Sequence, residues 1–132
     1  MTSDLYRRWL LEMWNGDFEL AYELVTPDFT GHWPGMDVTG PAGLVEALQQ
    51  GYAPFTGVKV TLDVGPIVDG DLVSARWTFT GGYRGGIPGA SVAEGTEVAF
   101  SGHDILRAEG DRFAEYWVIS DAQTFNKKLG IS

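Results

Sequence analysis

The sequence predicts one α+β domain spanning residues 1–132, in which helices come first and a curved antiparallel sheet follows. Apolar residues recur at helical spacing as far as Gly51 and alternate at strand spacing after Gly57. The chain contains no repeat and no long linker, and 132 residues with 44% hydrophobic residues are enough to bury one core. Together these observations favour a sheet that curls over the N-terminal helices.

Two tandem helices are expected at the start of the chain. Apolar residues at three- and four-residue spacing predict an amphipathic helix over residues 3–15, capped by Ser3 and ended at Gly16. Asp17 is predicted to cap a second, shorter helix that ends before Pro27.

The next stretch changes in composition. Residues 27–41 are rich in Gly, Pro, Thr and aromatic residues, which predicts a short strand followed by an irregular loop. We expect this loop to form the rim of a pocket. A third helix is predicted to begin at Pro41 and to end at Gly51.

The second half of the chain predicts strands joined by tight turns. Strands are expected over residues 58–64, 72–80, 97–106 and 112–119. Asp69-Gly70 is a hairpin signal, residues 83–95 form a Gly- and Pro-rich connection, and residues 109–111 form another turn. A terminal helix is expected over residues 121–129, capped by Ser120 or Asp121.

The composition excludes several classes of function. A formal net charge of −9 provides no basic face, so no nucleic-acid partner is expected. The chain lacks cysteine, its histidines at 32 and 103 make no ligand set, and it has no nucleotide-binding glycine motif, so we expect neither a metal nor a cofactor. Because it also lacks a signal peptide and a long apolar run, we expect no membrane contact and a cytoplasmic location.

Asp104 is the predicted centre of any chemistry. It stands in an otherwise apolar strand, where an unpaired charge is costly. If Asp104 points inward, alternation puts Gly102 and Leu106 on its face and His103 on the opposite one. The alternative is a purely structural acid that is paired with a strand arginine such as Arg76, whose own face the pattern leaves open.

Several motifs, spread over nearly the whole chain, resemble those of a known family. They include Trp14-Asn15-Gly16-Asp17, Gly31-His32-Trp33-Pro34, Tyr83-Arg84-Gly85-Gly86, Asp104-Ile105-Leu106-Arg107 and Glu115-Tyr116-Trp117. With them the chain resembles the SnoaL-like polyketide cyclase branch of the nuclear-transport-factor-2-like superfamily. This resemblance implies a cone-shaped fold whose central cavity, between the concave sheet and the helices, takes a hydrophobic small molecule.

The resemblance also implies site residues. The family's aromatic cyclases pair a histidine on one strand with an aspartate on the next, and matching without a gap puts Asp104 and Val118 at these positions, which disfavours aldol-type ring closure. Residues 34–40 also resemble a segment of polyether epoxide hydrolases and cyclases, which implies that Asp37 and Asp104 form an acid pair across the cavity, with His32 as orienter or acid. A plain turn role for Asp37 and a backbone-bonded rim role for His32 are the alternatives.

The remaining expectations concern the substrate and the assembly. Substrate contacts are predicted at Trp33, Arg76, Leu106, Tyr116 and Val118. Trp117 then faces outward, which favours a homodimer through the outer sheet face. The favoured function is a cofactor-free acid–base cyclase of secondary metabolism that closes a ring, dehydrates, hydrates or opens an epoxide on an apolar polyketide-like intermediate. The alternative is a non-catalytic module for small-molecule binding or dimerisation.

Overall fold

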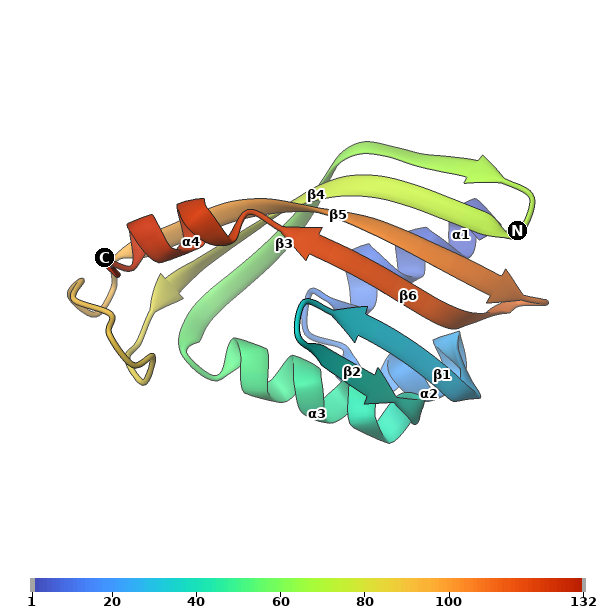
Figure 1. The fold of residues 1–132 in the computed structure, drawn as a ribbon, viewed down its shortest axis with the longest axis horizontal. Helices are drawn as coiled ribbons and strands as arrows, with labels where there is room; N and C mark the ends of the chain where they lie inside the picture. The colour runs from blue at the N-terminus through green and yellow to red at the C-terminus, as the bar shows by residue number, and fades with distance from the viewer. Residues whose placement is uncertain (1, 132) are drawn as a thin grey trace.

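The computed structural model describes residues 2–131 and confirms the α+β class (Figure 1). Within these residues a six-stranded sheet has the order β2-β1-β6-β5-β4-β3. The strands are β1 (Val25–Trp33), β2 (Met36–Thr39), β3 (Phe55–Asp69), β4 (Leu72–Tyr83), β5 (Glu97–Glu109) and β6 (Arg112–Ser120). The helices are α1 (Thr2–Arg7), the π-helix η1 (Arg8–Met13), the 3₁₀-helix η2 (Phe18–Leu20), α2 (Ala21–Leu24), α3 (Gly40–Tyr52) and α4 (Ala122–Lys128).

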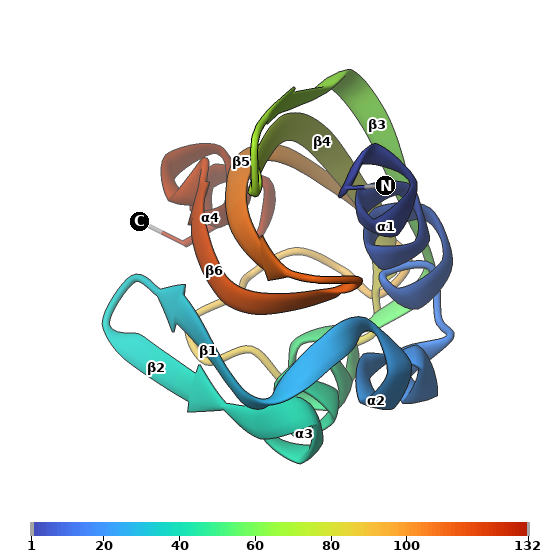
Figure 2. The ribbon, with the colours of Figure 1, turned by 90° about the vertical axis from the view of Figure 1, so that its right-hand side faces the viewer.

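The sheet is mixed, which corrects the expectation of a purely antiparallel one. Strands β3 to β6 form the predicted antiparallel meander. Strand β1, however, runs parallel to β6, with His32 beside Trp117 in the register. Alternation within a strand does not specify its neighbour, so the sequence pattern could not place β1. Viewed end-on (Figure 2), the strands arch around the interior, and α1 and α3 lie on the open side of the arch.

The first helix differs from the prediction in its geometry. It changes from an α-helix to a π-helix at Arg8, and the amide of Trp14 donates to the carbonyl of Trp9, five residues earlier, at 3.2 Å. Five residues of an α-helix turn through roughly 500°, which would separate these side chains around the axis. The wider turn instead brings the two indole rings to 6.2 Å between centroids, and Trp14 reaches the interior.

Three expected helix caps have different outcomes. Ser3 lies inside α1 rather than capping it. Asp17 occupies the N-cap position of η2, but its side chain makes no capping hydrogen bond there. Of the two candidates for α4, Asp121 is the cap, because its carboxylate accepts from the amide of Thr124 at 3.0 Å.

The predicted irregular loop is a β-hairpin. Strand β1 continues to Trp33, and β2 returns from Met36, so Pro34 and Gly35 alone form the turn. Proline followed by a residue with positive φ is typical of a type II turn, and Gly35 has φ +79°. Asp37 therefore lies on β2 rather than in a turn.

Asn15 covers one point of the sheet edge that β3 forms. Asn15 accepts from the backbone amide of Val60 at 2.7 Å and donates to the Val60 carbonyl at 3.0 Å. Both backbone groups of this edge residue are thus satisfied by one side-chain amide.

No helix among residues 2–131 combines the length and the apolar character needed to cross a bilayer.

Candidate active site

An aromatic cavity of about 230 Å³ lies between the concave face of the sheet and the helices. Its walls include Trp14 after η1, Tyr52 on α3, Trp77 on β4 and Trp33 at the end of β1. Asp104 contributes the carboxylate among the lining residues of the described chain. A largely apolar hollow with one acid is typical of a small-molecule site.

Three elements hold the carboxylate of Asp104. Its side chain is buried on β5, with 1% of the residue exposed. Among the described residues, Tyr6 on α1 donates to Oδ2 at 2.8 Å, while Trp77 on β4 and Tyr116 on β6 donate to Oδ1 at 2.9 Å each. A carboxylate has about four acceptor positions, so Oδ2, with one donor, keeps more acceptor capacity than Oδ1.

Burial and hydrogen bonding act in opposite directions on this acid. Burial raises the pKa of Asp104 from 3.8 to about 6, while the hydrogen bonds from Trp77, Tyr6 and Tyr116 limit the rise. Burial, reinforced by the negative charge of Asp104, raises the pKa values of Tyr6 and Tyr116, so both remain neutral donors. Asp104 is therefore suited to take up and return a proton near neutral pH.

Two glycines make room for two of the cavity's indole rings. Gly102 lies opposite Trp77 in the β4–β5 register, and a Cβ at Gly102 would stand 2.2 Å from Cζ2 of that ring. A Cβ at Gly31 would likewise stand 2.5 Å from Cζ3 of Trp33. The absence of a side chain at Gly102 thus lets Trp77 lie across the neighbouring strand and reach Asp104.

Four of the predicted residues line the cavity: Trp33, Asp104, Tyr116 and Val118. Asp104 and Val118 are direct partners in the β5–β6 register, as the ungapped matching implied. Leu106 shares their face but is fully buried and lies outside the cavity lining.

Arg76 lies on the outer face of the sheet, which corrects both of its predicted roles. In the register it stands beside His103, whereas Ala75 stands beside Asp104. Because successive strand residues point to opposite faces, Arg76 points away from the cavity and does not pair with Asp104.

Asp37 and His32 also lie outside the cavity. Asp37 has a side chain that is 66% exposed, and its Oδ1 is 3.0 Å from Nδ1 of His32. Nε2 of His32 is 2.7 Å from Oε2 of Glu115, and the imidazole stacks on Trp117 at 5.8 Å. These hydrogen bonds, that to Glu115 first, raise the pKa of His32. The predicted acid pair of Asp37 and Asp104 is therefore wrong in its geometry. Asp37 on β2 and His32 on β1 point outward, whereas Asp104 on β5 points into the cavity.

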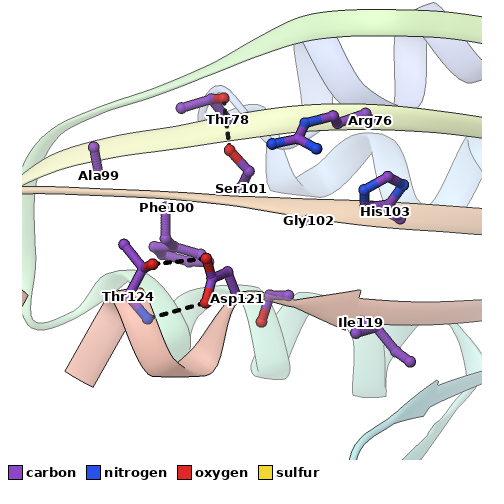
Figure 3. Close-up of a pocket in the computed structure, with 11 residues that line it drawn as sticks. Arg76, Thr78, Ala99, Phe100, Ser101, Gly102, His103, Ile119, Asp121 and Thr124 are labelled. Atoms are coloured by element: carbon purple, nitrogen blue, oxygen red, sulfur yellow. Dashed lines mark hydrogen bonds between the residues drawn. The ribbon is translucent and has the colours of Figure 1, made fainter. Parts of the chain in front are cut away.

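A second hollow, of about 430 Å³, lies on the outer face where β4 and β5 meet α4 (Figure 3). The hydroxyls of Thr78 and Ser101 are 3.1 Å apart, and Arg76 lies beside them. The acid of this hollow, Asp121, is used as the helix cap, and its hydrogen bonds to Thr124 lower its pKa. This hollow therefore has no unengaged carboxylate among the residues that the structure describes. No group of three His, Asp or Glu side chains suited to a metal occurs within residues 2–131.

Sequence patterns alone missed the donors Tyr6 and Trp77. Tyr6 is 98 residues away from Asp104, so no local pattern joins them. Trp77 had a detectable signal, because it shares a strand face with Ala75 and Phe79, both of which are buried.

Comparison with known proteins gives a consistent result. The family model of SnoaL-like polyketide cyclases matches residues 4–129. No curated protein matches the chain.

Solved structures give the same picture. The candidate polyketide cyclase IdmH from Streptomyces antibioticus is 26% identical, with a TM-score of 0.83 and 99% of each chain covered. A candidate polyketide cyclase from Acidithiobacillus ferrooxidans has a TM-score of 0.86 at 24% identity, covering 98% of this chain and 94% of the other. A protein of ketosteroid isomerase-like fold from Catenulispora acidiphila has a TM-score of 0.80 at 19% identity, covering 100% of this chain and 96% of the other. The last two likenesses concern the fold alone.

Proposed function

This chain belongs to the SnoaL-like polyketide cyclase family, and we propose that it catalyses a cofactor-free acid–base step of ring closure or dehydration on an apolar, polyketide-like compound. The observation that carries the proposal is Asp104, a buried carboxylate at the wall of an aromatic cavity, held there by three hydrogen-bond donors. Aromatic walls suit an apolar substrate, because they exchange its hydration for van der Waals contact.

In the proposed reaction one carboxyl transfers the proton in both directions. Ionised Asp104 removes a proton from a carbon next to a carbonyl, so the C–H bond breaks, an O–H bond forms on the carboxylate and the electron pair enters an enolate. The enolate then adds to a conjugated double bond of the same molecule, which closes a ring without an aldol step, or expels a β-hydroxyl. Protonated Asp104 returns its proton to the enolate that ring closure forms, or to the departing hydroxyl, which leaves as water. Val118 stands where a second acid would be, so Asp104 serves as both base and acid.

The proposal is tested by proton exchange on a simple ketone. 2-Tetralone, whose two fused rings carry a carbonyl with acidic neighbouring hydrogens, is incubated with the protein in D2O, and exchange at carbon is followed by NMR. The wild type should accelerate exchange, increasingly as the pH rises through about 6, and Asp104→Asn should lower the acceleration by roughly 100-fold or more. Asp111→Asn, which changes an exposed acid in the β5–β6 turn, is the matched control. Equal exchange by the wild type and a folded Asp104→Asn variant would remove this residue from the chemistry.

A binding module is the second candidate function. The engagement of both Asp104 oxygens by hydrogen bonds also suits a carboxylate that only shapes a ligand pocket. Saturable binding of 2-tetralone without any exchange would favour this reading over catalysis.

A further inference from the structure

We propose that Trp33 sets the size limit of the molecule that enters the cavity, restricting it to about two fused rings; this inference rests on the proposed function of the Asp104 site. The cavity of about 230 Å³ is smaller than roughly 300 Å³, the lower end of the range for drug-sized ligands. A polyketide-like compound of three fused rings would therefore fill most of the cavity, and a larger ring system would exceed it.

Trp33 stands at the boundary between two hollows. It lines the inner cavity, and with Pro34 and Val118 it also lines a groove of about 440 Å³ on the outer side. The groove is mainly apolar, with Trp117 and Ile119 among its walls. The end of β1 and the turn after it thus separate two spaces that are both suited to apolar groups.

The indole of Trp33 is held in place by two contacts. One side of the ring lies over Gly31, where a Cβ would be only 2.5 Å away. The ring also meets Tyr116 edge-on, at 5.1 Å between centroids, and Tyr116 is bound to Asp104. The tight turn through Pro34 and Gly35 fixes the backbone next to it.

The position of this ring has a steric consequence. A planar ring system that reaches Asp104 extends toward the walls of the cavity, and the indole closes the side that faces the groove. Removing the indole would enlarge the cavity and join it to the groove, because Pro34 and Val118 border both. Trp33 therefore selects by size without taking part in proton transfer.

The test compares the binding of two phenols by fluorescence titration. 2-Naphthol has two fused rings and 2-phenanthrol has three, and both present a hydroxyl that can donate to Asp104. The wild type should bind 2-naphthol at least tenfold more tightly than 2-phenanthrol. Trp33→Ala should shift this ratio at least tenfold toward 2-phenanthrol, and Trp33→Phe should shift it by a smaller factor in the same direction.

The control is Trp117→Ala, which removes an indole from the groove but not from the cavity and should leave the ratio unchanged. Cooperative thermal melts establish that each variant is folded, and Trp33→Phe decides the question if Trp33→Ala does not fold. An unchanged ratio in the folded Trp33 variant, or a wild type that does not bind 2-naphthol, overturns the proposal. A shifted ratio without any exchange of 2-tetralone would overturn the proposed function alone, because binding is measured independently of turnover.

Discussion

Replacing Asp104 by Asn should stabilise the fold at neutral pH while it abolishes the proposed chemistry. Burial raises the pKa of Asp104 from 3.8 to about 6, so the folded state holds the proton more tightly than the unfolded chain does. At about 1.4 kcal/mol per pH unit, this rise corresponds to roughly 3 kcal/mol by which ionisation destabilises the fold. The cost is absent below pH 3.8, grows between pH 3.8 and about 6, and is complete above that.

Asparagine can keep the hydrogen bonds of Asp104. Its Oδ1 can accept from Trp77 and Tyr116 as the carboxylate does, and its amide can donate to the hydroxyl of Tyr6, which accepts as well as donates. The substitution therefore removes the buried charge while each of the four side chains keeps at least one hydrogen-bond partner.

The measurement is urea unfolding at a series of pH values from 3.5 to 8. The free energy of unfolding of Asp104→Asn minus that of the wild type should rise by roughly 3 kcal/mol between the lowest pH and pH 7.5. Asp111→Asn, at an exposed turn position, should show no comparable rise. A difference that stays constant with pH, or that falls as the pH increases, would refute the argument that ionised Asp104 destabilises the fold.

Three further changes have defined outcomes. Gly102→Ala should displace the Trp77 ring and lower the free energy of unfolding in urea by about 1–3 kcal/mol. It should also raise the pH at which 2-tetralone exchange begins, because the hydrogen bond from Trp77 lowers the pKa of Asp104. A wild-type free energy of unfolding together with a wild-type exchange profile would contradict the role given to this glycine. Glu115→Gln should lower the pKa of His32 in an NMR titration. In the wild type the ion pair stabilises the fold at acidic pH, and this stability is lost as the pH rises through the raised pKa of His32, so the variant should be less stable than the wild type at acidic pH. An unchanged titration would argue against the hydrogen bond. We also expect a homodimer through the outer sheet face, so light scattering should give twice the chain's 14.4 kDa for the wild type and the single mass for Ile119→Asp; a monomeric wild type would refute it.

The inner part of the site followed from local alternation. Asp104, Tyr116 and Val118 point inward, while His103 and Trp117 point outward, as the two-residue period of β5 and β6 predicts. Alternation alone gives only which residues share a face, because it is a property of short stretches of sequence. That the face of Tyr116 and Val118 lines the cavity came from the resemblance to the family.

The parts that could not be predicted depend on distant pairing. Tyr6 reaches Asp104 only because α1 packs against the sheet, and His32 faces outward because it lies beside the outward-facing Trp117 in the β1–β6 register. The acid pair with Asp37 failed for the same reason, since a resemblance of local sequence does not determine which face of the sheet the hairpin presents.

The amide of Asn15 affects how molecules of this protein meet one another. Strand β3 ends the sheet, and such a strand offers a row of free backbone groups along which a second sheet can add. Asn15 occupies both groups of Val60, and Pro66, further along the same strand, has no N–H to offer. A second sheet that added along this edge would therefore find both groups of Val60 already taken and no donor at Pro66, which disfavours such growth at these two points.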